Sequence, residues 1–273
     1  MTDKTIELIK QFKPEPVDIP LNKCELEEAV EAIYTSMFPV CDCDGSTDIS
    51  QELYSASEKL HKNISRRTNE KTADKVLEAF IESLPSIRQR LYEDAHCYLA
   101  SDPAAKSLEE VILTYPGFFA LSIHRLAHRL YQLGKPLIAR YFSEYAHSKV
   151  GIDIHPAAKI GKNLFMDHGT GIVIGETSEI GNNVKIYQGV TLGALYVEKK
   201  LSNIKRHPTV EDNVVIYANA TILGGNTVIG HDSIIGGGAW LTHSVIPYSK
   251  VHNSVGIKIR TTNDFNGPFD FVI

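Results

Sequence analysis

The sequence predicts an α+β protein in which an α-helical N-terminal half precedes a parallel β-helix built from six-residue repeats. Two observations predict it: apolar residues recur at three- and four-residue intervals before about residue 150, and at six-residue intervals after it. A six-residue period suits neither one helix nor one strand, but it is typical of a β-helix, in which each unit places one short strand on one wall of a prism. The markers are Ile154, Ile160, Met166, Ile174, Ile180, Ile186, Leu192, Val210, Ile216, Ile222, Ile229, Ile235 and Leu241.

The spacing of these markers favours the prism over an ordinary β-sandwich with a coincidental period. Each step is six residues, except one of eight after Met166 and one of seven after Ile222. The rhythm also stops between Leu192 and Val210. Repeats of this kind bury their core only against neighbouring turns, so we expect the marker side chains to stack inward.

The N-terminal half shows a series of helical patterns. After an extended lead-in over residues 1–20, Asn22 and Glu25 predict a capping box, and Pro39 ends the first pattern. Further patterns run over about 48–64, 73–99, from Ser107 onward, 117–134 and 136–149. We therefore divide the chain into a helical domain, a β-helix with an excursion, and a C-terminal tail. The bounds are 1–150, 151–250 with the excursion at 193–209, and 251–273.

The composition excludes several classes of protein. The 273 residues are 43% hydrophobic and 22% charged, as in ordinary soluble proteins. A net charge of −5 argues against a nucleic-acid partner, which needs a clustered basic surface. The four cysteines show no metal or disulfide spacing, the N-terminus has no signal peptide, and no apolar run is long enough to cross a membrane. We expect a cytoplasmic protein that binds no membrane.

Two motifs suggest metal binding at first sight. The segment from Asp42 to Gly45 is similar to a calcium loop, but aligning its glycine places Val40 at the first ligand position, so a turn between helices is favoured. His124 and His128 have a spacing that can hold a metal, but no third ligand lies nearby in the sequence. Packing or surface roles are favoured, and no metal is predicted.

Five motifs of the second half resemble those of one enzyme family. They are Asp153-Ile-His-Pro-Ala-Ala-Lys-Ile-Gly161, Met166-Asp-His-Gly-Thr-Gly171, Gly175-Glu-Thr177, Val190-Thr-Leu-Gly193 and Arg206-His-Pro208. Together they resemble serine acetyltransferase, of the hexapeptide-repeat acyltransferase superfamily. The resemblance covers roughly residues 100–247 well and the preceding region only loosely.

The resemblance implies an activity, a hand and an assembly. Members of this family transfer acetyl from acetyl-CoA to the hydroxyl of L-serine in cysteine biosynthesis, without a metal. The β-helix would be left-handed and would pack as a trimer, and the helical domains would pair trimers into hexamers and help to complete the active site. L-Cysteine would act as a feedback inhibitor at the serine site. The six-residue period alone indicates neither the handedness of the β-helix nor the oligomeric state of the protein.

A general base is the first requirement of this chemistry, because a free hydroxyl is a poor nucleophile at neutral pH. Histidine suits the task, and His168 lies between Asp167 and two glycines that leave room for ligands. The resemblance implies that His168 removes the serine proton, that Asp153 orients the imidazole, and that the alkoxide attacks the thioester directly. Asp153 precedes His168 by fifteen residues, close to one prism turn of about eighteen, which permits contact without establishing it.

Serine carries charges of both signs, so its site needs both signs as well. By the same resemblance, Arg206 would clamp the carboxylate, Asp102 and Asp167 would receive the ammonium, and His207 would complete the pocket. Asp102 precedes Pro103, so an alternative is that it caps the following helix.

Acetyl-CoA and its oxyanion are expected along the prism. The resemblance places the oxyanion donor in the turn that contains Gly193 and Ala194, where Ala replaces the family's second glycine. It places acetyl-CoA near Tyr217, Ala218 and Gly236.

The excursion and the tail are the remaining candidates for binding. Loops that leave a rigid scaffold collect binding residues, and the cations of the excursion suit an anionic ligand, although a solvated loop is equally compatible. These cations are Lys199, Lys200, Lys205 and Arg206. The chain ends at Ile273, and the resemblance implies that such an isoleucine inserts into O-acetylserine sulfhydrylase.

Three other functions compete with serine acetylation. The same fold can acetylate another hydroxyl, such as that of homoserine, a sugar or an antibiotic, but the charged set favours an amino acid. A carbonic anhydrase needs zinc-binding histidines close together, and the histidines of the prism are at least twelve residues apart. A non-catalytic scaffold that binds a partner through its tail would not need His168.

Overall fold

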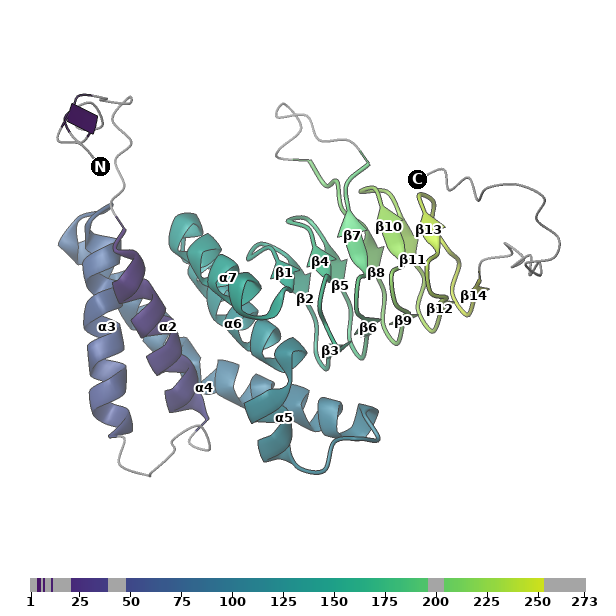
Figure 1. Cartoon of the computed structure of the whole chain (residues 1–273), viewed down its shortest axis with the longest axis horizontal. Coiled ribbons are helices and arrows are strands. Elements are labelled where there is room, and N and C mark those ends of the chain that lie inside the picture. The colour runs from purple at the N-terminus through teal and green to yellow at the C-terminus, as the bar shows by residue number, and fades with distance from the viewer. Residues whose placement is uncertain are drawn as a thin grey trace.

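The computed structural model describes residues 4, 5, 7, 11, 21–38, 48–195 and 204–252. A helical region is followed by a prism of parallel strands, which confirms the predicted fold class (Figure 1). The helices are α2 (Lys23–Met37), α3 (Ile49–Ser65), α4 (Glu70–Ser101), α5 (Leu108–Thr114), α6 (Pro116–Gln132) and α7 (Pro136–Val150). The calcium-like segment at 42–45, Lys199, Lys200 and the tail with Ile273 lie outside the described residues. The three-domain division stays a prediction.

The helix starts follow from their capping residues. The Asn22 side chain accepts a hydrogen bond from the Glu25 N–H at 3.3 Å, and Ser107 caps α5 in the same way. The other half of the predicted capping box is wrong, because the Asn22 N–H donates to Asn63 instead. Proline occupies the first turn of both α6 and α7, where its missing N–H costs nothing.

The strands form three walls, and all thirteen predicted markers lie in them. Wall A contains β1 (Asp153–Ile154), β4 (Val173–Ile174), β7 (Thr191–Gly193), β10 (Thr221–Leu223) and β13 (Trp240–Leu241). Wall B contains β2 (Lys159–Ile160), β5 (Glu179–Ile180), β8 (Thr209–Val210) and β11 (Val228–Ile229). Wall C contains β3 (Phe165–Asp167), β6 (Lys185–Tyr187), β9 (Val215–Ile216), β12 (Ile234–Ile235) and β14 (Lys250–Val251). Three neighbouring strands make one coil.

The markers stack in register inside the prism. On wall A, Ile154 pairs with Ile174, which pairs with Leu192, and the ladder continues through Ile222 to Leu241. Most of the markers are buried, and the buried apolar residues of the prism and the helices form one continuous cluster. Because each coil covers the next, stability comes from stacking, as the period predicts.

The irregular steps of the sequence shape two corners of the prism. The CA corner, where the chain passes from wall C to the next strand of wall A, contains the eight-residue step after Met166. His168, Gly169 and Gly171 have positive φ there, so this longer corner turns through the left-handed backbone region that glycine adopts readily. The AB corner, between walls A and B, holds the excursion between β7 and β8.

The helical region is fastened to the first coil by buried polar contacts. Asp94 is fully buried and accepts hydrogen bonds from the Arg125 Nε at 2.7 Å and the Asn163 N–H at 2.9 Å. Arg125 also donates to the Gly161 carbonyl. The Tyr98 hydroxyl accepts from the Met166 N–H at 3.1 Å. These contacts hold α4 and α6 against the strand that leads into the CA corner.

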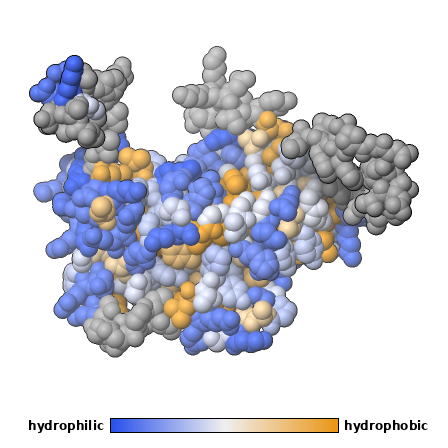
Figure 2. All heavy atoms as spheres, viewed as in Figure 1, coloured by the Kyte–Doolittle hydropathy of each residue, from blue (hydrophilic) through white to orange (hydrophobic). Residues whose placement is uncertain are grey.

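The face of the molecule drawn in Figure 2 is mostly polar. On the face in Figure 2, apolar side chains occur in small groups among polar ones. None of the helices among the described residues is both long and apolar enough to span a bilayer.

Candidate active site

An acidic cluster with one histidine lies at the CA corner. Asp102 follows α4, and Asp167 ends β3 directly before His168. The Asp167 carboxylate accepts a hydrogen bond from the His168 N–H at 2.9 Å and lies 3.7 Å from its Nδ1. The His168 side chain lies close enough to Asp102 for an electrostatic interaction between the two groups. The structure thus brings together three predicted site residues from α4 and wall C.

Tyr115 is a fourth member of this cluster, and no motif in the sequence pointed to it. Its hydroxyl donates to Asp102 Oδ2 at 2.6 Å, while the Ala104 N–H donates to Oδ1 at 2.8 Å. These two bonds, with the Tyr115 bond first, lower the pKa of Asp102. The alternative for Asp102 is wrong: Ser107 caps the next helix, and Asp102 forms a short turn with Ala104.

Asp153 is not bonded to His168. Within the described part of the chain, no hydrogen bond or ion pair joins the two side chains, and the His168 side chain is 71% exposed. Asp153 is in register with Val173, twenty residues later, because the wide CA corner lengthens the first coil. Its carboxylate instead lies within 4.8 Å of groups on Glu144 and His147, at the end of α7. The pairing of Asp153 with His168 therefore stays a prediction.

A second cluster lies at the AB corner and contains Arg206 and His207. The Arg206 guanidinium forms an ion pair with Glu176, which orients it. The Thr177 hydroxyl accepts hydrogen bonds from the Arg206 and His207 N–H groups, at 2.9 and 3.0 Å. It lies 2.9 Å from His207 Nδ1 and can donate to it. Thr177 thus holds the backbone of both residues and the imidazole of His207.

The environment of His207 sets its tautomer and keeps it neutral. Its Nδ1 accepts from the Thr177 N–H at 3.1 Å, so the ring proton lies on Nε2. Burial, reinforced by Arg206, lowers the pKa of His207 to about 4. The ring packs directly on Gly175, where an added Cβ would lie only 1.9 Å from His207 Cδ2. The glycine of the Gly175-Glu-Thr motif is therefore required by close approach.

This depressed pKa makes stability depend on pH. The folded protein resists protonation of His207 between its folded pKa of about 4 and its unfolded value near 6.5, so the free energy of unfolding falls as pH drops through that window. We expect His207→Asn to flatten the pH dependence of Tm between pH 6.5 and 4. The same change at His243, which is exposed, is the control. Parallel curves for wild type and His207→Asn would contradict this account.

The predicted cofactor residues are divided between the same two corners. Gly193 and Ala194 lead into the AB corner, and Ala194 has no positive φ, so alanine replaces glycine there without backbone strain. Tyr217, Ala218 and Gly236 lie at the CA corner after β9 and β12. The Tyr217 ring is 44% exposed and stacks on Tyr187, with centroids 5.1 Å apart. Tyr187 is a further residue that the sequence did not single out.

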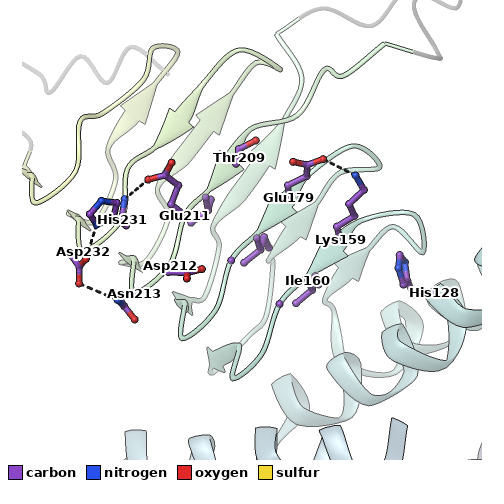
Figure 3. Close-up of a pocket in the computed structure, with 14 residues that line it drawn as sticks. His128, Lys159, Ile160, Glu179, Thr209, Glu211, Asp212, Asn213, His231 and Asp232 are labelled. Carbon is purple, nitrogen blue, oxygen red and sulfur yellow. Dashed lines mark hydrogen bonds and ion pairs between the residues drawn. The ribbon is translucent and has the colours of Figure 1, made fainter. Parts of the chain in front are cut away.

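A cavity of about 820 Å³ on wall B contains none of the predicted site residues (Figure 3). Several of its charged groups are already engaged: Lys159 pairs with Glu179, and the His231 ring pairs with Asp232. Glu211 accepts from the backbone N–H of His231, and Asp212 accepts from that of Asn182. It does not carry the predicted chemistry.

The histidine pair of α6 forms no metal site with other described residues. His124 is 3% exposed, and the His128 Nδ1 lies 2.8 Å from the Pro156 carbonyl oxygen. The two ring centroids lie 5.7 Å apart, and among the described residues neither histidine belongs to a group of three potential metal ligands.

Comparisons with known proteins identify relatives of this chain. The chain is 52% identical over 200 residues to a plasmid-encoded serine acetyltransferase of Synechococcus elongatus, across 71% of this chain and 61% of that protein. It is 48% identical over 170 residues to serine acetyltransferase of Bacillus subtilis, across 62% of this chain and 75% of that protein. No protein-family model matches the chain.

Solved structures give the same result over more of the chain. Serine acetyltransferase isoform 3 of Entamoeba histolytica, in complex with cysteine, superposes with a TM-score of 0.77 and 36% identity, over 87% of this chain and 85% of that one. The Neisseria gonorrhoeae serine acetyltransferase, in complex with serine, superposes with a TM-score of 0.60 and 29% identity, over 83% and 95%. This chain is a member of the serine acetyltransferase family.

Proposed function

We propose that the protein is a serine O-acetyltransferase, which transfers acetyl from acetyl-CoA to the hydroxyl of L-serine. The observation that carries the proposal is the cluster of Asp102, Asp167 and His168, in which two carboxylates lie beside an exposed imidazole. The carboxylates suit an ammonium group, and the imidazole suits the proton of a neighbouring hydroxyl. The Neisseria relative, solved with serine, supports the same acceptor.

The proposed reaction has no acyl-enzyme. His168 takes the hydroxyl proton of serine as the oxygen attacks the thioester carbonyl of acetyl-CoA. The tetrahedral intermediate then collapses, the carbon–sulfur bond breaks, and the imidazolium returns the proton to the departing thiolate of CoA. A backbone N–H of the turn at Gly193 and Ala194 would meet the oxyanion. Asp153 would orient the imidazole, which requires the exposed His168 ring to rotate from the position described above.

The charges of the two clusters match the two ends of serine. Asp102 and Asp167 would hold the ammonium group. Arg206 would bind the carboxylate through two parallel N–H donors, and the Nε2–H of neutral His207 would add another donor. Tyr217, Ala218 and Gly236 would lie along acetyl-CoA.

Because the clusters occupy different corners of the prism, we infer that a second copy of the chain completes each site. The CA and AB corners flank wall A, so copies arranged with wall A facing a common axis would bring one copy's His168 to the next copy's Arg206. The outward side chains of wall A are in register. They are Asp153, Val173, Thr191, Thr221 and Trp240. A head-to-tail contact of this kind closes into a ring, which supports the trimer, alone or paired as a hexamer.

L-Cysteine is the proposed feedback inhibitor. It differs from serine only by a thiol in place of the hydroxyl, so the same charged groups would hold it. Two relatives from Entamoeba histolytica are solved in complex with cysteine. Inhibition is expected to be competitive with serine.

The C-terminal residues are the proposed contact with O-acetylserine sulfhydrylase. We expect that removing residues 269–273 abolishes co-elution with that enzyme and leaves acetyl transfer unchanged. An unaltered complex would remove the proposal.

Tyr115 is proposed to position Asp102 for the ammonium group. Tyr115→Phe removes the 2.6 Å hydrogen bond and raises the pKa of Asp102. We expect the KM for serine to rise about tenfold with little change in kcat, and the acid limb of serine binding to move to higher pH. The matched control is Tyr141→Phe, which removes a similar tyrosine–carboxylate bond, to Glu27, outside the site. Equal effects of the two changes would contradict a positioning role.

The acceptor is tested by measuring CoA release from acetyl-CoA with L-serine and with L-homoserine. The proposal predicts turnover with serine and identification of O-acetylserine by mass spectrometry. Turnover only with homoserine would keep the acyltransferase chemistry and reject the named substrate.

A further inference from the structure

A second, basic cavity lies between α4, α6 and β2, outside both proposed clusters. We call it the basic cavity; its volume is about 460 Å³. Its lining comes from one face of α4, one face of α6 and one prism residue: Ser83, Ser86, Ile87, Arg90, His124, Arg125, His128, Arg129, Gln132 and Ile160. The residues from each helix recur at three- and four-residue intervals, so both helices turn a polar face toward the same space.

The charge of the basic cavity is positive. Three arginines line it, and the lining among the described residues contains no Asp or Glu. The third arginine, Arg125, is neutralised by its ion pair with the buried Asp94 carboxylate. Arg90 has a loose contact with Glu93 at 3.6 Å on its own helix, and the Arg129 Nη2 donates only to the Ala79 carbonyl, at 3.3 Å. Arg129 therefore has no carboxylate within ion-pair distance among the described residues, whereas Arg90 has the Glu93 carboxylate on the edge of the cavity.

Two polar atoms of the lining are buried and lack a partner. They are Arg129 Nε, a donor, and Nδ1 of His124, a side chain that is only 3% exposed. The Ala158 carbonyl accepts a hydrogen bond from the His124 ring, and burial holds the pKa of His124 well below its usual range. His124 is therefore neutral with its proton on Nε2, and its Nδ1 is a hydrogen-bond acceptor that has no donor. Buried polar atoms left unpaired are costly, so these two atoms indicate a bound polar group.

We propose that the basic cavity binds a protonated tetrahedral oxyanion of the phosphate class. Arg90 and Arg129 would hold its oxygens, and the hydroxyls of Ser83 and Ser86 can rotate to donate as well. His124 Nδ1 would accept the proton that the anion retains. Inorganic phosphate keeps a proton at neutral pH and sulfate does not, so the acceptor favours phosphate over sulfate.

The test is thermal unfolding of the full-length protein without acetyl-CoA, in a phosphate-free buffer with chloride matching the ionic strength. The probes are inorganic phosphate, glycerol 3-phosphate and sulfate. At about a hundred times its Kd, phosphate is expected to raise Tm by about 5 °C, and sulfate by much less. Phosphate monoesters have a second pKa of about 6, so at neutral pH glycerol 3-phosphate mostly lacks this proton and is expected to stabilise less than phosphate. Stronger stabilisation by the ester would contradict the role of the retained proton.

Substitutions of the lining arginines test whether the stabilisation by phosphate arises from binding in the basic cavity. We expect Arg129→Gln and Arg90→Gln each to weaken phosphate binding about tenfold, as measured by calorimetry. Arg90 is partly exposed, so its replacement tests the site even if Arg129→Gln unfolds. Arg67→Gln, at an exposed site after α3, is the matched control. Equal phosphate shifts in wild type and Arg90→Gln, or equal affinity for sulfate and phosphate, would overturn the proposal.

Discussion

His168→Ala is expected to reduce kcat for acetyl transfer to L-serine by roughly 10²–10⁴-fold, because a positioned general base contributes that much. The KM for serine should change less, since the charged groups that hold its ammonium and carboxylate remain. The His168 side chain is largely exposed and makes few contacts, so its removal should leave Tm near the wild-type value. The measurement is the rate of CoA release at saturating serine.

The control for this prediction is His231→Ala. His231 is also a histidine beside an aspartate at a corner of the prism, but it lies between walls B and C, away from both clusters. Its replacement should leave turnover unchanged. A rate for His168→Ala close to that of wild type would mean that another group takes the proton.

Arg206→Gln is expected to raise the KM for serine by about two orders of magnitude, because two charge-assisted hydrogen bonds to the carboxylate are lost. The change also leaves the Glu176 carboxylate without its ion pair, and this carboxylate would repel that of serine. Arg206→Lys should recover only part of the affinity, since an ammonium cannot make the planar two-pronged contact.

An acceptor substrate that has no carboxylate separates the loss of carboxylate binding from any other effect of Arg206→Gln. Ethanolamine keeps the hydroxyl and the ammonium of serine, so its low turnover should be nearly the same in wild type and Arg206→Gln. The double change Glu176→Gln with Arg206→Gln removes the repulsion and should restore part of the serine affinity. Equal losses for serine and ethanolamine would show that Arg206 supports the fold of the AB corner rather than the carboxylate.

The prism could be predicted because its cause is local. An inward side chain every six residues is required at each wall, and each marker from Ile154 to Leu241 lies in a strand. The irregular spacing also corresponds to structure: the eight-residue step after Met166 is the longer corner between β3 and β4, which contains His168. Helix ends marked by Asn22 and Ser107 were also predictable, because a capping side chain bonds within three residues.

The site could be predicted only in part, because its partners meet through tertiary packing. Tyr115 reaches Asp102 across thirteen residues, and only the packing of α5 and α6 against α4 sets that contact. Thr177 reaches Arg206 and His207 across the excursion, for the same reason. The sequence analysis allowed contact between Asp153 and His168, fifteen residues apart, because it assumed that one turn of the prism takes about eighteen residues. The first coil takes twenty, so the register puts Val173 there.

The most direct test of a serine site shared between two copies is co-expression of His168→Ala with Arg206→Gln, followed by CoA release at low serine. Each variant alone should be nearly inactive. In randomly mixed trimers, about a quarter of the sites would combine an intact His168 corner with an intact Arg206 corner, so we predict about a quarter of wild-type activity. Activity no greater than the average of the two separate variants would place both corners of each site in one chain and contradict the account.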